Sequence, residues 1–212
     1  MRADAHISVS KTRVRNVNLR RHAAARYESG RCFAVATAIG SPRLWSYATG
    51  AALEGFDMGL AECNATDMPR LEAAYAGGRK RMHKRCEALL ERMLPDSMLV
   101  GLLLGSTELH VVSVGTGRVY LHRDGQPQRL TPRDEHDKGL LGGVAARCSS
   151  PISPGDIVLA GSSTAFSVKA IAKLASVLAA DPKTPASVLA TLLTEPAGRA
   201  DVGAAAVALR IK

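Results

Sequence analysis

The sequence has few cysteines, few aromatic residues and no long apolar run, and each shortage excludes a class of protein. Its four cysteines, at positions 32, 63, 86 and 148, include no C-x-x-C pair, so neither a zinc site nor a disulfide framework is indicated. The longest apolar run, Leu99 to Leu104, is far shorter than the roughly 18 residues of a membrane-spanning helix. Residues 1–21 also lack the apolar stretch of a secretory signal. We therefore expect a cytoplasmic protein with reduced cysteines.

Acidic residues are scarce relative to basic ones. The chain carries 28 Lys and Arg against 19 Asp and Glu, a formal charge of +9. Such a charge is compatible with several kinds of partner: nucleic acid, an anionic surface, or an acidic or phosphorylated protein. The charge alone does not distinguish among them. With 212 residues and 46% hydrophobic content, the chain is long and apolar enough for one compact core. We expect a single domain over residues 1–212.

Strand and helix patterns follow one another in groups. Apolar and β-branched runs predict strands, and apolar residues at helical spacing predict helices. The arginine-rich segment 15–26 is interpreted as a connection between the first two strands. Strands are expected at 6–14, 31–39, 98–104, 108–114, 117–122, 156–161 and 202–211, and helices at 48–63, 67–93, 164–180 and 184–193. Strands in runs with paired helices between them favour sheets packed on each other and covered by helices.

A dense cluster of basic residues follows Gly77 and Gly78, which are expected to interrupt the helix from residue 67. Five of the seven residues from 79 to 85 are cations, and they form a candidate partner surface: Arg79, Lys80, Arg81, Lys84 and Arg85. One interpretation is a solvated helix face, and the other is a nucleic-acid patch. No aromatic residue interleaves with the cations, so stacking on bases has little support.

Several strings, in their order along the chain, resemble the metal-dependent Ser/Thr phosphatases of the type 2C (PPM) family. Segment 112–121, VSVGTGRVYL, matches the strand pair around Gly-Asp-Ser-Arg-x-Tyr, and segment 155–164, GDIVLAGSST, matches the strand leading into Ser-Asp-Gly. Segments 15–20 (RNVNLR), 36–40 (ATAIG) and 200–207 (ADVGAAAV) stand where the family has Arg-x-x-Asn-Glu-Asp, Asp-Gly-x-Gly-Gly and Asp-Asn. The resemblance implies an α+β fold, a PPM-type four-layer sandwich of two packed antiparallel β-sheets flanked by pairs of antiparallel helices.

The resemblance also implies where metal ligands would stand. In the family, aspartates hold two Mg²⁺ or Mn²⁺ ions that activate the attacking water, and such hard cations need charged oxygen ligands. Here the corresponding positions are degenerate: Leu19, Arg20, Thr37, Ser163 and Asp201. Thr116 likewise replaces the aspartate of Gly-Asp-Ser-Arg. One carboxylate cannot assemble a binuclear site, so we expect no metal, no other cofactor and no catalytic residue.

Two arginines stand within the degenerate site. Arg15 occupies the position of a phosphate-contacting arginine in many family members, and Arg20 brings a permanent positive charge to a ligand position. Both are candidate phosphate or anion-binding residues, although ordinary surface or salt-bridging roles remain open. We expect Arg20 to point into the vacated metal pocket and to form a salt bridge with Asp201.

The remaining chemical candidates are weaker. The cluster DEHD at 134–137 is interpreted as a solvated loop, and His83, His110 and His122 have no second ligand at metal-binding spacing. The hydroxyl run 162–164 lacks the setting of a catalytic nucleophile and is expected to cap a helix. Segment 137–154 is shorter than the flap that many enzymes of the family have at the same place in the chain.

These observations favour a pseudophosphatase, a catalytically inactive phosphatase-like protein. It would act as a regulatory or binding module by engaging a protein partner, acidic or phosphorylated, in a kinase and phosphatase pathway. A basic nucleic-acid-binding protein that uses the 79–85 face is one alternative. A hydrolase with residual or altered phosphatase activity is another.

Overall fold

The computed structural model describes residues 2–10, 23–28, 31–87, 89, 94–133 and 137–212. Within them the chain forms two five-stranded sheets in which every neighbouring pair of strands is antiparallel. The first sheet runs, in spatial order, β1 (Ala3–Ser10), β10 (Ala204–Ile211), β9 (Ile157–Gly161), β6 (Arg118–Arg123) and β7 (Gln126–Arg129). The second runs β2 (Ala23–Glu28), β3 (Cys32–Ile39), β4 (Asp96–Leu104), β5 (Glu108–Val114) and β8 (Ala146–Pro151).

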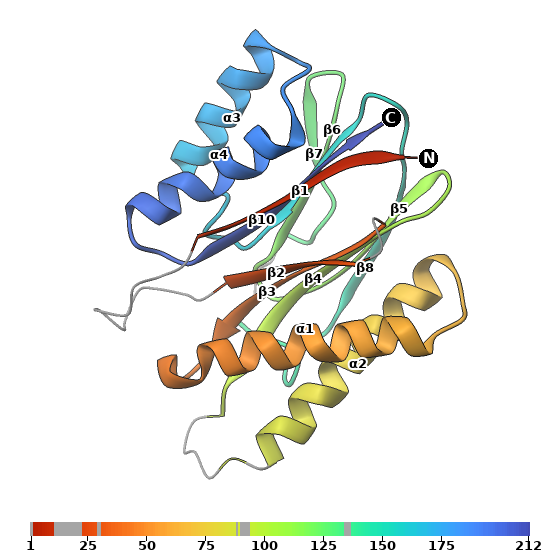
Figure 1. Cartoon of the computed structure of the whole chain (residues 1–212), viewed down its shortest axis with the longest axis vertical. Helices are drawn as coiled ribbons and strands as arrows, with labels where there is room; N and C mark the ends of the chain where they lie inside the picture. The colour runs from red at the N-terminus through yellow and green to blue at the C-terminus, as the bar shows by residue number, and fades with distance from the viewer. Residues whose placement is uncertain (1, 11–22, 29–30, 88, 90–93, 134–136) are drawn as a thin grey trace.

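The sheets lie face to face, and helices cover the outer face of each (Figure 1). After a short 3-10 turn (Pro42–Leu44), helices α1 (Trp45–Glu62) and α2 (Asp67–Glu87) pack on the second sheet. Helices α3 (Val168–Ala180) and α4 (Ala186–Arg199) lie over the first. The result is a four-layer α+β sandwich, which confirms the fold expected from the sequence.

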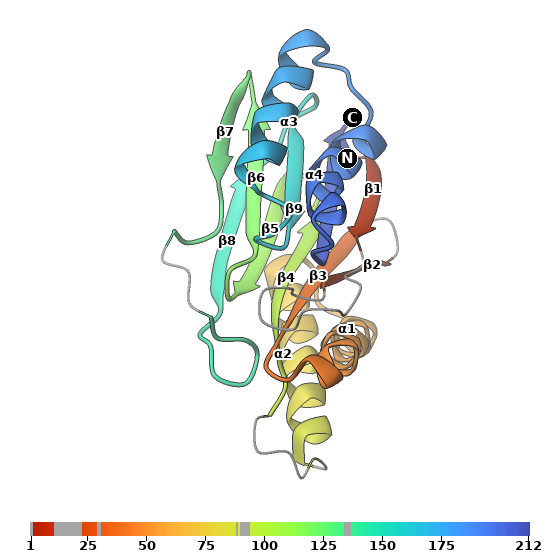
Figure 2. The ribbon, with the colours of Figure 1, turned by 90° about the vertical axis from the view of Figure 1, so that its left-hand side faces the viewer.

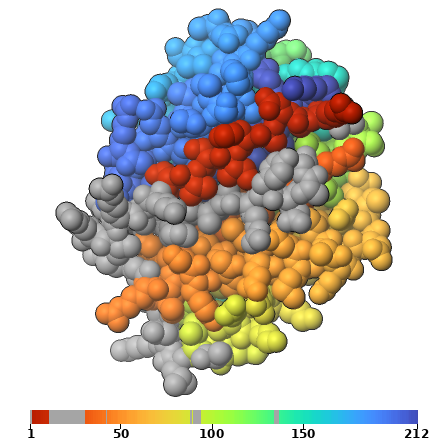
Figure 3. Space-filling view, viewed as in Figure 1, coloured from red at the N-terminus to blue at the C-terminus, as the bar shows by residue number. Residues whose placement is uncertain are grey.

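Three apolar clusters hold the layers together. One lies between the sheets, and one lies between each sheet and its helices. Strands β3, β4, β9 and β10 are therefore buried on both faces, which explains why their sequences are almost continuously apolar rather than alternating. The edge strand β1 crosses the surface between the two helical layers (Figure 3).

The strands missed by the sequence analysis are edge strands. Strand β2 lies partly within segment 15–26, which was interpreted as a connection, and no strand was expected at the positions of β7 and β8. The sequences of β7, QPQR, and β8, ARCSSP, are polar and contain proline, because an edge strand has one unpaired side and more solvent contact.

Helix α2 corrects a second expectation, because it continues through Gly77 and Gly78 and ends at Glu87 rather than near residue 93. These glycines allow α1 and α2 to cross closely. A Cβ on Gly77 would lie 2.3 Å from the carbonyl oxygen of Gly55, and one on Gly59 would lie 2.3 Å from that of Ala73. The glycines that predicted a helix break are required instead for helix packing.

In the part of the chain that the structure describes, no helix is long and apolar enough to cross a membrane.

Candidate functional site

Of the positions expected to be degenerate metal sites, Thr116 and Ser163 lie in contact, and Thr37 is linked to them through Met98. Thr37 lies near the end of β3 and pairs with Met98 on β4, so their side chains share the face that points toward the other sheet. Thr116 is in the turn between β5 and β6, and Ser163 is the second residue after β9. The two sheets therefore bring residues from four separate segments together.

Met98 is the centre of this cluster. Its Sδ atom accepts a hydrogen bond from the backbone N–H of Thr116 at 3.3 Å, and the Thr116 hydroxyl lies 3.2 Å from both that sulfur and Ser163 Oγ. Gly115, with φ of 88°, makes room for it, since a Cβ there would lie 2.4 Å from Met98 Cγ. Met98 and Thr37 are buried at 1% and 4% exposure. A buried thioether thus contacts the Thr116 hydroxyl, which in turn contacts Ser163.

Asp201 lies on the loop that enters β10. Its backbone has φ of 55°, in the left-handed region that aspartate tolerates, and its N–H donates to the carbonyl of Gly198 in the last turn of α4. The same loop is tied to the turn after β9, because the Thr164 hydroxyl donates to the Gly203 carbonyl at 2.7 Å. Asp201 is therefore held on a segment bonded to the turn that contains Ser163.

The hydroxyls of Ser162 and Thr164 do not cap a helix, which corrects the sequence expectation. They bond to each other at 2.8 Å, and Ser162 Oγ accepts from the N–H of Ala205. The residue that caps α3 is Ser167, whose hydroxyl accepts from the N–H of Ala170. The hydroxyls of Ser162 and Thr164 thus tie the turn after β9 to the start of β10 and the residue before it.

The donor set does not fit a binuclear Mg²⁺ or Mn²⁺ site. Among the described residues, the cluster offers the hydroxyls of Thr37, Thr116 and Ser163 and a thioether, and Asp201 lies on the loop that is tied to the Ser163 turn. Hard divalent cations require several charged or carbonyl oxygens, and thioethers favour softer metals. No group of three or more His, Cys, Asp or Glu side chains with metal-binding geometry occurs in the described part of the chain. Arg15, Leu19 and Arg20 lie outside the described residues, so the expected contact between Arg20 and Asp201 stays a prediction.

Sequence reasoning missed a second organising residue, Asp96. Its carboxylate accepts hydrogen bonds from the N–H groups of Ser97 at 2.7 Å, Gly139 at 3.1 Å and Leu141 at 3.2 Å. Burial raises the pKa of Asp96, although these backbone hydrogen bonds act in the opposite direction. Asp96 thereby fixes the segment that lines a cavity of about 280 Å³ beside the cluster, whose wall includes Gly115, Pro132, Lys138, Gly143 and Val144. An isolated aspartate before an apolar run carries no sequence signal for this role.

The basic residues of α2 divide into two groups. Arg79, Lys80 and Lys84 are exposed. Arg81 instead forms a two-pronged ion pair with Glu54 of α1, at 2.5 and 3.2 Å, and Arg85 lies 3.4 Å from the same carboxylate. The hydrogen bond from Arg81 is the main reason that the pKa of Glu54 is lowered. Three of the five expected surface cations are therefore exposed, while the other two join the helices.

The histidines also differ in their settings. His110 is buried, with Nδ1 2.8 Å from Ser149 Oγ and Nε2 3.4 Å from the Asp67 carboxylate. This contact anchors the start of α2 to β5. His122 lies on β6 at an apolar pocket described below. Of the DEHD cluster, residues 134–136 lie outside the described part of the chain.

Comparison with known proteins identifies the fold. The serine/threonine phosphatase PstP/Ppp of Mycobacterium tuberculosis matches with a TM-score of 0.80 at 18% identity, over 100% of both chains. The PPM Ser-Thr phosphatase MsPP of Mycobacterium smegmatis matches with a TM-score of 0.74 at 20% identity, over 98% of both chains. The catalytic domain of PstP in complex with two manganese ions matches at 0.76 and 17% identity, over 99% of this chain and 100% of that one. No protein-family model and no curated protein matches the sequence. At these identities the likeness establishes the PPM phosphatase fold alone.

Proposed function

We propose that this chain is a pseudophosphatase, a non-catalytic PPM-fold protein that regulates a phospho-signalling system by binding a protein partner. The observation that carries the proposal is the contact of the Thr116 hydroxyl with both the buried Met98 sulfur and Ser163 Oγ, with Thr37 paired to Met98 on the neighbouring strand. Positions that would have to supply carboxylates carry hydroxyls, and a buried thioether contacts one of them.

The chemical reason is the loss of two catalytic contributions together. In a metal-dependent phosphatase the ions generate the nucleophilic hydroxide and neutralise charge that develops on the phosphoryl group. Neutral hydroxyls do neither. Substituting a guanidinium for a ligand, as Arg20 does in the sequence, adds a charge that repels a divalent cation.

The surface charge supports an acidic or phosphorylated partner. The chain has a formal charge of +9, and α2 presents Arg79, Lys80 and Lys84 to solvent. Arg15 and Arg20 are the candidate contacts for a phosphate group in the former pocket, because guanidinium binds phosphate through paired, charge-assisted hydrogen bonds.

Calorimetry and an activity assay test the loss of catalysis. We expect no saturable heat when MnCl₂ is added, and no metal-dependent hydrolysis of a phosphopeptide. Asp201→Asn is the matched control, because it removes the one carboxylate at a position expected to hold metal. Turnover at roughly one per second or more, lost in both EDTA and Asp201→Asn, would show that the chain is a phosphatase. Turnover at that rate that the substitution leaves unaffected would also contradict the proposal and would show that catalysis does not need Asp201.

Affinity capture from the native cell tests the partner. We expect a specific protein to be retained by the wild type and lost when Arg79, Lys80 and Lys84 are all changed to Glu. The control reverses three exposed lysines elsewhere: Lys169, Lys183 and Lys212. Loss of binding in both variants would indicate attraction by net charge and would contradict a defined surface.

The exposed cations of α2 also favour a second candidate function, nucleic-acid binding. If Arg79, Lys80 and Lys84 neutralise three phosphates of duplex DNA, reversing them should flatten the log–log salt dependence of affinity by about 2.7. A salt slope that the substitutions leave unchanged would exclude this face as the nucleic-acid site.

A further inference from the structure

An apolar pocket of about 340 Å³ lies between α3 and the hairpin of β6 and β7. It is on the outer face of the first sheet, the face covered by α3 and α4. In Figure 2 the hairpin stands beside α3, with β7 at the outer edge. The sheet contributes Tyr120, His122, Pro127 and Leu159, and the helix contributes Ile171, Leu174, Ala175, Leu178 and Ala179.

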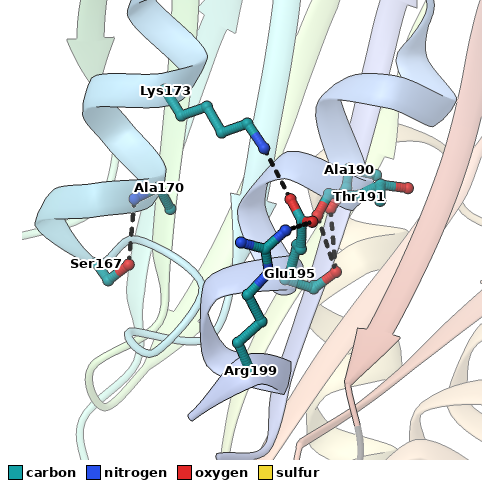
Figure 4. A network of polar contacts seen from close by, with 8 residues as sticks. Ser167, Ala170, Lys173, Ala190, Thr191, Glu195 and Arg199 are labelled. Carbon is teal, nitrogen blue, oxygen red and sulfur yellow. Dashed lines mark hydrogen bonds and ion pairs between the residues drawn. The ribbon is translucent and has the colours of Figure 1, made fainter.

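Helix α3 faces α4 on one side and the pocket on the other. Lys173 Nζ lies 2.9 Å from Glu195 Oε2 of α4, and Arg199 Nη2 lies 2.5 Å from the other oxygen of that carboxylate (Figure 4). On its other side α3 presents Ala175 and Ala179, four residues apart on one helix face. Larger side chains at these two positions would fill the space next to the hairpin.

The lining combines an apolar body with one polar end. The rings of Tyr120 and Phe166 pack at 5.1 Å, tilted by 52°, and alkyl side chains of α3 form the facing wall. At the polar end is His122, whose pKa is lowered by burial and then by the charge of Arg210. The effect of Arg210 on the pKa of His122 follows from the strand register. His122 is paired with Ile157, and Ile157 is paired with Arg210, so the three side chains share one face of the sheet. The neutral imidazole can donate a hydrogen bond, and the guanidinium charge attracts an anion.

We propose that this pocket binds one small carboxylic acid with an alkyl body, its carboxylate at His122 and its chain along α3. The volume selects a small molecule over a peptide. Its volume of about 340 Å³ is at the lower end of the range for small-molecule pockets, which begins at about 300 Å³. A pocket of that size is too small for a peptide helix, which is about 10–12 Å across with its side chains. The positive field at His122 selects an anionic head group over a cationic one. This site is independent of the proposed pseudophosphatase function, and either can fail without the other.

Calorimetric titration with decanoate is the primary test. We expect saturable binding of one molecule per chain, weakened about fourfold for each methylene removed from the acid. Decanol should bind more weakly than decanoate, because it lacks the charge that Arg210 attracts. Equal affinity for the acid and the alcohol, or no dependence on chain length, would overturn the proposal.

Variants of α3 locate the binding. The double variant Ala175→Leu with Ala179→Leu should fill the pocket and abolish binding. Both alanines are exposed and leucine is also a good helix former, so the fold should be retained. Ala172→Leu is the matched control, since Ala172 is exposed on the same helix but does not line the pocket. Binding that survives the double variant, or that Ala172→Leu also removes, would refute the site.

A further substitution tests the polar end. His122→Phe should keep the apolar body of the site and bring the affinities for decanoate and decanol together. An unchanged preference for the acid would show that the carboxylate lies elsewhere. If sedimentation instead shows a dimer that the double leucine variant dissociates, the pocket is a contact between copies of the chain and the proposal is wrong.

Discussion

Replacing Met98 by alanine should destabilise the protein strongly without creating a metal site. The Met98 side chain is 1% exposed, and it fills the space between Thr37, Thr116 and Gly115. Truncating a buried methionine to alanine costs about 2–5 kcal/mol. We expect about 3 kcal/mol here, because Gly115 and the Thr116 turn have limited freedom to close the cavity. For a chain of this size, that corresponds to a fall in melting temperature of about 6–12 °C.

Urea denaturation at pH 7 measures the loss, with Met98→Leu as the control. Leucine keeps most of the volume and removes the sulfur, so it should cost less than about 1.5 kcal/mol. Calorimetry with MnCl₂ should show no binding to Met98→Ala, because opening the space supplies no carboxylate. A wild-type unfolding midpoint for Met98→Ala would refute the view that this side chain fills the site. A Met98→Leu loss as large as that of alanine would assign the effect to the sulfur contacts.

Two further outcomes follow from contacts outside the site. Arg123→Ala should lower the denaturation midpoint at pH 7, because it removes the ion pair of 2.6 Å that holds the buried Asp156 carboxylate. Burial raises the pKa of Asp156, but the hydrogen bonds from Arg123 and a backbone N–H outweigh it and leave the pKa below the ordinary 3.8. The pair's stabilisation is therefore present above that pH and lost below it, so the midpoints of variant and wild type should converge in acid. Gly59→Ala should cost about 1–3 kcal/mol, because its Cβ would meet the Ala73 carbonyl and overpack the helix crossing. Gly50→Ala on the same helix, with nothing within 4 Å of its Cβ, should instead raise stability; equal effects of the two substitutions would contradict the close crossing.

The central strands could be predicted from the sequence because burial on both faces leaves a continuous apolar run. Strands β3, β4, β9 and β10 carry that pattern. Strands β2, β7 and β8 do not, because a strand at the edge of its sheet makes fewer apolar contacts and its identity depends on the neighbour it pairs with. Which strand it pairs with is determined by the tertiary fold and cannot be seen in the local sequence.

The sequence could point to residues of the candidate site, but not to the side chain at its centre. Resemblance to the phosphatase strings located Thr37, Thr116 and Ser163, and the structure places the last two in contact. Nothing in the sequence distinguished Met98 from the other apolar residues of its strand. Its role depends on Gly115, whose absent side chain leaves room for the thioether. Similarly, Gly77 predicted a helix break from the local sequence, whereas it is glycine because α1 crosses α2 closely at that point.

The position of β10 has a consequence for how the molecule assembles during synthesis. Strand β10 lies in the interior of its sheet, between β1 and β9, and Ala3 pairs with Ile211. Among the described strands β1 pairs with β10 alone, so β1 acquires its neighbour only after residues 204–211 have been synthesised. All strands of the second sheet, with α1 and α2, lie between residues 23 and 151, so that half can form earlier. A premature stop codon that removed β10 would not trim an edge. It would leave β1 without the strand that it pairs with and separate it from β9, β6 and β7.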